Sequence, residues 1–190
     1  MLAYLTRQSE RSSGSGLVGR VEADWRGTVK DLVLVRIDDR LIHGQIATQW
    51  LKTTHANKVL VMDDALPDNA FQVRILKAAA PSGIKVVVKD VEGGVAWCLR
   101  EPKEDERVMV LVKVPETIEA LIDGGISLHD VILGGMGFKE GRSRINRNVS
   151  ASPEEVECMQ RIVARGTRIL YQLVPSDAPK DLNNVLAERE

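Results

Sequence analysis

The sequence Val35-Arg36-Ile37-Asp38-Asp39-Arg40-Leu41-Ile42-His43-Gly44-Gln45 is the stretch around which the rest of the chain is organised. Its apolar start continues a short strand, and its end opens a predicted helix. The loop between them holds one imidazole, two arginines and two aspartates. An imidazole is largely unprotonated near neutral pH, and a guanidinium meets a phosphate through two parallel hydrogen bonds. The stretch therefore predicts a phosphohistidine site on an α/β fold.

His43 is the predicted acceptor of the phosphoryl group, although an isolated histidine more often serves packing or the surface. Gly44 would let the backbone approach a ligand, and a helix starting there adds free N–H groups and a dipole worth roughly 0.3 to 1 kcal/mol for a surface anion. The two flanking arginines would repel one another unless an anion visited. His55 and His129 lack such neighbours, so we assign them surface or turn roles.

The charged side chains of this loop are predicted to have different roles. Arg40 would bridge phosphoryl oxygens. Asp38 would accept a hydrogen bond from the imidazole nitrogen that stays unphosphorylated, and its alternative is a turn residue or a helix cap. Arg36 would either support the phosphate or pair with Asp39 or Asp64.

The loop closely resembles the phosphorylation loop of the mannose/sorbose-type IIB components of the bacterial sugar phosphotransferase system. The pattern Arg, apolar, Asp, any, Arg, apolar, apolar, His, Gly, Gln is complete, and the resemblance extends over about residues 30–186. It implies a cytoplasmic phosphocarrier enzyme without a cofactor or metal. It also implies that phosphate comes from a phosphorylated IIA component and goes to a sugar imported by IIC and IID membrane components.

Further phosphate-binding or supporting residues are predicted at the carboxyl ends of strands, where open α/β sheets bind ligands. They are Gly44, Gln45, Asp63, Gly134, Gly135 and Met136. A glycine cluster alone marks a turn more often than a phosphate cradle, so the family resemblance carries the prediction for the last three. Arg142-Ser143 and Asn146 match the family pattern beyond them. Arg144, Arg147, Asn148 and Gln172 depart from it.

From residue 31 onward, short β-branched runs alternate with longer amphipathic segments, which indicates βα units and a mostly parallel sheet. The predicted strands are 32–37, 58–62, 84–88, 107–112, 130–133 and 168–174. The predicted helices are 45–52, 67–80, 91–99, 115–124, 153–166 and 180–187. Residues 138–149 alternate and turn at Gly141, which predicts a hairpin. We expect a single three-layer α/β domain with helices on both faces of the sheet.

The composition of the 190 residues favours one such domain, and 26 basic against 27 acidic residues give no reason to expect nucleic acid as a partner. Cys98 and Cys158 lack the spacing of a metal site and are assigned to packing as reduced thiols. No apolar run has the roughly 18 residues of a membrane helix. Residues 1–27 are predicted to be a flexible extension, whether native, a start-site artefact or a cloning remnant, which leaves 28–190 as the IIB domain.

A second function remains open, that of an α/β regulatory module that binds a nucleotide or another anion in the same crevice. A nucleotide site would ordinarily carry Gly-x-x-x-x-Gly-Lys-Ser/Thr, or Gly-x-Gly-x-x-Gly entering a helix. Neither pattern occurs, because Glu140 stands where the third glycine of the second pattern would follow Gly135 and Gly137. Phosphorylation by a protein donor separates the two hypotheses.

Overall fold

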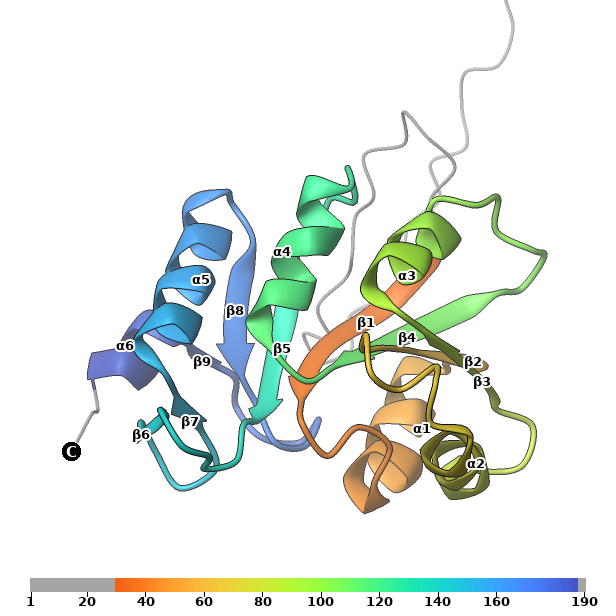
Figure 1. The fold of residues 1–190 in the computed structure, drawn as a ribbon, viewed down its shortest axis with the longest axis horizontal. Coiled ribbons are helices and arrows are strands. Elements are labelled where there is room, and N and C mark those ends of the chain that lie inside the picture. The colour runs from red at the N-terminus through yellow and green to blue at the C-terminus, as the bar shows by residue number, and fades with distance from the viewer. Residues whose placement is uncertain (1–29, 188–190) are drawn as a thin grey trace, which may run out of the picture.

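The computed structural model describes residues 30–187, which form a sheet covered by helices (Figure 1). The strands of the main sheet are β1 (Asp31–Asp38), β2 (Lys58–Met62), β3 (Lys85–Lys89), β4 (Arg107–Val112), β5 (Asp130–Gly135), β8 (Arg168–Tyr171) and β9 (Lys180–Asp181). Their order is β3-β2-β4-β1-β5-β8-β9, and every pair is parallel except β8 with β9. The extension predicted for residues 1–27 lies outside the described residues.

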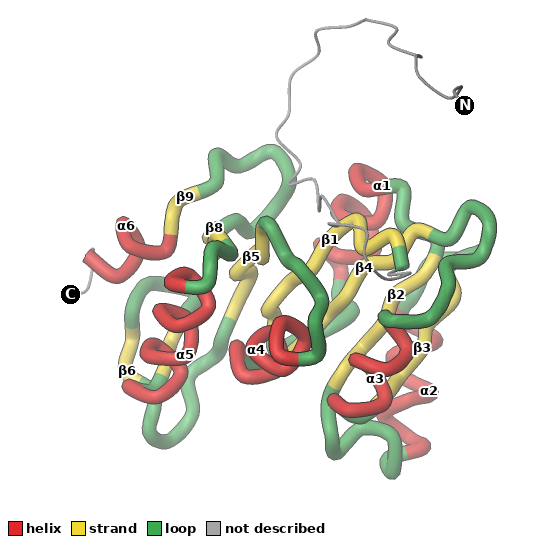
Figure 2. Tube along the Cα trace, turned by 90° about the horizontal axis from the view of Figure 1, so that it is seen from above, coloured by secondary structure: helices red, strands yellow, loops and turns green. Residues whose placement is uncertain are grey.

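The helices follow the strands in the alternation that the sequence predicts. They are the π-helical turn η1 (Ile46–Trp50), α1 (Leu51–Thr54), α2 (Ala70–Ala79), α3 (Val91–Cys98), α4 (Pro115–Asp123), α5 (Pro153–Ala164) and α6 (Leu182–Ala187). Figure 2 shows α1 on one side of the strands and α3, α4 and α5 on the other. The mostly parallel three-layer α/β architecture is therefore confirmed.

Side chains of the central strands alternate between two cores, one on each face of the sheet. In β4, Val110 and Val112 belong to the core under α3, α4 and α5, whereas Met109 and Leu111 belong to the core that includes Trp50. All of these side chains are buried. The alternation follows from the pleat of a strand, whose successive residues point to opposite faces. It makes the sheet a rigid platform for the loops at its carboxyl edge.

Two predicted helix starts are wrong. Helix α2 begins at Ala70 instead of Pro67, because the side chain of Asn69 caps it by accepting a hydrogen bond from the backbone N–H of Gln72 at 3.0 Å. At the carboxyl end of the chain, Lys180–Asp181 form β9 against β8, and α6 starts only after them. The backbone there is satisfied by strand pairing, which the helical pattern of the sequence does not indicate.

The predicted hairpin exists, but its turn lies later than Gly141. Strands β6 (Ser143–Arg144) and β7 (Ser150–Ala151) pair antiparallel around a turn over residues 145–149. The side-chain oxygen of Asn146 closes that turn by accepting hydrogen bonds from the backbone N–H groups of Asn148 and Val149 at 2.9 and 3.0 Å. This closed turn stabilises the hairpin, which lies beside the carboxyl end of β5.

Candidate functional site

Asp38, the last residue of β1, lies at the centre of the candidate site. Its buried carboxylate is 3.1 Å from Nε2 of His43 and accepts hydrogen bonds from Arg36 and Arg40. Burial alone would raise the pKa of this carboxyl, but the hydrogen bonds from His43 and Arg40 and the charge of Arg36 hold it well below its usual value. Asp38 is therefore a carboxylate at neutral pH.

The contact with Asp38 fixes which nitrogen of His43 is available for chemistry. A carboxylate only accepts hydrogen bonds, so Nε2 of His43 carries the proton and, in the neutral ring, Nδ1 has the lone pair. The imidazole is partly exposed, with 18% of its side-chain surface accessible. The predicted pairing of Asp38 with His43 is thus present. Asp38 also has the alternative role of a turn residue, because its carboxylate accepts a hydrogen bond from the backbone N–H of Arg40 at 3.3 Å.

Leu41 shapes the loop in a way that the sequence does not indicate. Its φ angle is 56°, in the left-handed region that residues other than glycine rarely adopt, at a cost of order 1 to 3 kcal/mol. The conformation is stabilised because the side chains of Leu41 and Ile42 are buried and the Leu41 N–H donates to the carbonyl of Asp38 at 2.9 Å. The buried pair anchors the loop while His43, next in sequence, reaches the surface.

Arg36 supports the site from beneath instead of lining it. Its guanidinium is fully buried, donates to both Asp38 and the carbonyl of Gln172, and lies 5.0 Å from the ring centre of Trp50. The predicted alternative, that Arg36 pairs with Asp39 or Asp64, is wrong. Residues two positions apart in a strand point to the same face, so Arg36 meets Asp38 instead. Arg36 therefore fixes the position of the carboxylate that meets His43.

The absence of a side chain at Gly134 leaves room for the guanidinium of Arg36. A Gly134→Ala substitution should therefore lower the free energy of unfolding by about 1 to 3 kcal/mol. A Cβ at this position would lie 1.9 to 2.4 Å from three guanidinium atoms that are already held by hydrogen bonds. The free energy of unfolding in urea measures the effect. Gly44→Ala is the matched control, because nothing lies within 4 Å of a Cβ there, and equal stability of the two variants would contradict the prediction.

Arg40, Gly44 and Gln45 lie around His43 on the exposed side of the loop. Arg40 has half of its side-chain surface accessible, and its Nε and Nη2 donate to the two oxygens of Asp38, both at 3.0 Å. Its Nη2 also lies 3.5 Å from the side-chain oxygen of Gln45. Helical structure begins at Gly44, whose surroundings are open. Arg40 and the helix start at Gly44 are therefore both accessible beside His43.

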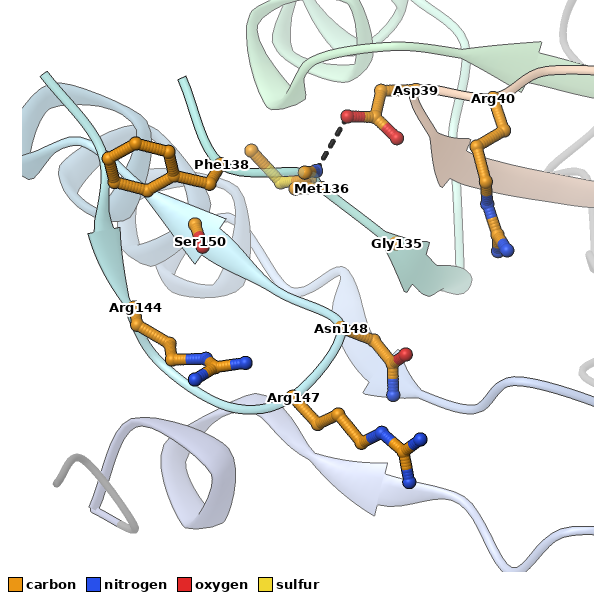
Figure 3. A pocket seen from close by; sticks show the side chains of 10 residues that line it. Asp39, Arg40, Gly135, Met136, Phe138, Arg144, Arg147, Asn148 and Ser150 are labelled. Carbon is orange, nitrogen blue, oxygen red and sulfur yellow. Dashed lines mark hydrogen bonds between the residues drawn. The ribbon is translucent and has the colours of Figure 1, made fainter. Parts of the chain in front are cut away.

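The loop after β5 joins this arrangement through Asp39. The Asp39 carboxylate accepts from the backbone N–H of Gly137 at 2.6 Å, and the Asp39 N–H donates to the carbonyl of Gly135 at 3.1 Å (Figure 3). Beside these contacts lies a pocket of about 700 Å³. Its walls include Arg40, Gly135, Met136, Phe138, Arg144 and Arg147. The two predicted loops therefore converge, and the pocket adjoins the His43 loop through Arg40.

Asp63 does not join the cluster. The order of the strands puts β4 between β2 and β1, so Asp63, which follows β2, lies two strands away from Asp38. Its carboxylate pairs with Lys113 at 2.9 Å and accepts from the backbone N–H of Ala65. Within residues 30–187, no hydrogen bond or ion pair connects it to His43, and its role is the closing of a turn.

Arg142 holds the second loop in place, a role that sequence reasoning missed. Its guanidinium donates to both oxygens of Glu155 at 2.6 and 2.8 Å and to the carbonyl of Gly137 at 2.8 Å, and it lies 3.7 Å from Asp39. Glu155 also accepts from the backbone N–H of Ser152 in the predicted cap of α5. The cap was recognisable as Ser-x-x-Glu, but the pairing of its glutamate with Arg142 depends on the tertiary fold.

The two cysteines are buried and take no part in the site. Burial raises the pKa of both thiols, Cys98 and Cys158, to about 12, so neither is a thiolate at neutral pH. The described part of the chain has no group of His, Cys, Asp and Glu side chains arranged to hold a metal ion. None of its helices is long and apolar enough to span a membrane.

The chain is similar in sequence to several known proteins. A family model described as the PTS system sorbose subfamily IIB component matches residues 32–190. The chain is 32% identical over 151 residues to the sorbose-specific EIIB component of Lacticaseibacillus casei, which covers 80% of the chain and 92% of that protein. It is also 32% identical over 155 residues to the mannose-specific EIIAB component of Escherichia coli K12, a match that covers 82% of the chain. The chain spans about half the length, 48%, of that relative.

Solved structures share the fold. The IIBSor domain of the sorbose permease from Klebsiella pneumoniae superimposes with a TM-score of 0.77 at 29% identity, covering 82% of this chain and 95% of that chain. The crystal structure of manxB from Thermoanaerobacter tengcongensis gives the same TM-score at 30% identity, covering 85% and 98%. A sorbose-specific IIB protein of Klebsiella pneumoniae is thus similar to this chain both in sequence and in fold.

Proposed function

The chain belongs to the sorbose subfamily of IIB components of the sugar phosphotransferase system, and on that premise we propose that His43 is its phosphorylated residue. The observation that carries the proposal is the 3.1 Å contact between Nε2 of His43 and the buried carboxylate of Asp38. In this contact the Nε2–H of His43 donates to the carboxylate, which selects the tautomer, orients the ring and leaves the Nδ1 lone pair as the nucleophile. The residues 28–190 would then act as one phosphocarrier domain.

In the first half-reaction, the Nδ1 lone pair of His43 attacks the phosphorus of a phosphohistidine on a IIA component. The donor's P–N bond breaks as the new P–Nδ1 bond forms, and the donor imidazole regains its lone pair. The transferring group is loosely bonded and its charge lies on three oxygens, so the protein contributes mainly position and electrostatic stabilisation. The free donors of Arg40 and the helix start at Gly44 supply that stabilisation.

In the second half-reaction, a sugar hydroxyl attacks the same phosphorus and gives up its proton to solvent. The P–Nδ1 bond breaks and His43 returns to its starting state. Relatives of this chain are named for mannose, sorbose, fructose and N-acetylgalactosamine, so we propose a hexose or an N-acetylhexosamine as acceptor. The sugar would be presented by IIC and IID membrane components, which places the reaction at the cytoplasmic face of the membrane.

The source of the phosphate tests this proposal against the nucleotide-binding alternative. The chain should take up phosphate within seconds to minutes from a phosphorylated IIA component, and none from ATP with magnesium. The glycines after β5 lead into the β6–β7 hairpin instead of a helix, so the dinucleotide-binding geometry is not formed. Radiolabel transfer measures both reactions, with the donor mixture lacking IIA as control. Autophosphorylation from ATP would favour the regulatory module.

A further inference from the structure

Arg144 and Arg147 project from the β6–β7 hairpin at the wall of the pocket beside the His43 loop (Figure 3). Both are exposed, and within residues 30–187 neither guanidinium has a hydrogen bond or an ion pair. The other arginines around the site differ in this respect, because Arg40 pairs with Asp38 and Arg142 pairs with Glu155. The two hairpin arginines are therefore the unpaired cations of the pocket.

The local charge of the pocket contrasts with that of the whole chain, whose formal net charge is −1. Three arginines line the pocket, Arg40, Arg144 and Arg147, and the carboxylate that faces them is that of Asp39. That carboxylate is already occupied by the backbone N–H of Gly137. The pocket thus has a positive local electrostatic potential on a nearly neutral protein. Such a potential attracts and orients an anionic ligand or protein surface.

Hydrogen bonds hold the hairpin against Met136 and Tyr171, so the backbone positions that carry the two arginines are fixed. Asn148 donates from its side-chain amide to the hydroxyl of Tyr171 at 2.9 Å, and its carbonyl accepts from the backbone N–H of Met136 at 3.0 Å. The backbone N–H of Ser150 donates to the carbonyl of Met136 at 2.7 Å. Binding at a fixed surface loses less conformational entropy than binding at a mobile one.

Phe138 adds an apolar element to the same surface. It lines the pocket with 79% of its surface exposed, the largest exposed fraction among the large apolar residues that the structure describes. Phenylalanine, methionine and arginine are enriched at protein interfaces, and arginine is among the residues that most often dominate the binding energy. A free phosphate would use the arginines but gain nothing from the exposed ring.

We propose that Phe138, Arg144 and Arg147 form a docking surface for the protein that donates phosphate, and that they meet an acidic surface with an apolar patch around its phosphohistidine. This inference rests on the proposed function, because it assigns a partner to the same site. Charge favours the donor over the acceptor, since a phosphohistidine brings a doubly charged group whereas a sugar hydroxyl is neutral.

The test compares Arg144→Ser/Arg147→Ser with a control, Arg74→Ser/Arg100→Ser. The control removes the same charge from two exposed arginines, one on α2 and one just after α3, whose side chains have no ion pair within the described residues. The donor is a phosphorylated IIA component that phosphorylates the wild-type chain. We expect the hairpin variant to raise KM for this donor about tenfold at low salt with kcat unchanged, and to flatten the dependence of KM on salt. The control should behave as the wild type.

A second matched pair tests the apolar part. Phe138→Ser should raise KM severalfold, whereas Phe71→Ser, which changes a phenylalanine 65% exposed on α2, should not. Phosphoramidate, a small phosphoryl donor that needs no docking, should phosphorylate all variants at the wild-type rate.

Each outcome decides one of the two proposals. If no IIA component phosphorylates His43, the proposed function fails. If the wild type is phosphorylated and the hairpin variant has the same KM, the docking surface fails and the function stands. Equal slowing of the hairpin variant with phosphoramidate would show a small-anion site, and slowing only of transfer to the membrane-bound sugar would show that the surface faces the acceptor. Either result overturns the inference.

Discussion

Replacing His43 by alanine should abolish phosphorylation by a phosphorylated IIA component, a loss limited only by the detection of the assay. His43 combines a partly exposed ring with a buried carboxylate that holds one ring nitrogen protonated. No other histidine of residues 30–187 has such a partner at the carboxyl edge of the sheet, because His129 pairs with Asp130 at the start of β5 and His55 ends α1. Wild-type protein should carry an acid-labile, base-stable adduct, which peptide mass spectrometry under alkaline conditions locates.

Variants of the other histidines provide the control for this experiment. His55→Ala and His129→Ala should accept phosphate at the wild-type rate, and a melting temperature of His43→Ala close to that of the wild type should show that its fold is intact. The assignment fails if the His43→Ala protein still takes up phosphate, or if the adduct of the wild type maps to Cys98.

Replacing Asp38 by asparagine should have the largest effect on stability, a loss of about 3 to 5 kcal/mol in the free energy of unfolding. The carboxylate and the guanidinium of Arg36 are both fully buried, so the substitution leaves a buried positive charge without its counter-ion. Urea unfolding monitored by tryptophan fluorescence measures the loss. Asp39→Asn is the matched neighbour, because an amide oxygen can still accept from the N–H of Gly137 and the side chain is partly exposed. Losses of similar size in the two variants would show that burial of the ion pair is not the cause.

The stability difference between the wild type and the Asp38→Asn variant should depend on pH. The pKa of Asp38 is held below its unfolded value of about 3.9, so its stabilisation is fully present above that value and is lost as the pH falls toward the folded pKa. The difference in unfolding free energy between wild type and Asp38→Asn should therefore be constant near neutral pH and shrink below about pH 4. A difference that grows on acidification would contradict the assigned direction.

Local patterns were sufficient to predict much of this fold. The β-branched runs of β2 and β4 are bounded by charged residues, and both strands have the predicted bounds, 58–62 and 107–112. The cap at Ser152 could be predicted because a capping box is made within one turn of chain. The proximity of Asp38 and His43 was predictable for the same reason, since a strand end and a short loop bring nearby residues together.

The rest depends on contacts between distant parts of the chain. Arg36 donates to the carbonyl of Gln172, and Arg142 pairs with Glu155 across the hairpin, which no local pattern encodes. The left-handed backbone of Leu41 is stabilised by burial of its side chain, whereas sequence patterns reserve that conformation for glycine or asparagine. The separation of Asp63 from the site follows from the insertion of β4 between β1 and β2, a matter of strand order.

The buried thiols have a practical consequence for spectroscopy. Cys98 and Cys158 are buried, and their thiols remain protonated far above neutral pH. A maleimide dye, which reacts with an accessible thiolate, would therefore label a cysteine introduced on the surface in preference to these two. A fluorophore attached to a Ser143→Cys variant, at an exposed position of the hairpin, would then report arrival and departure of a partner in a stopped-flow instrument while both native cysteines are kept.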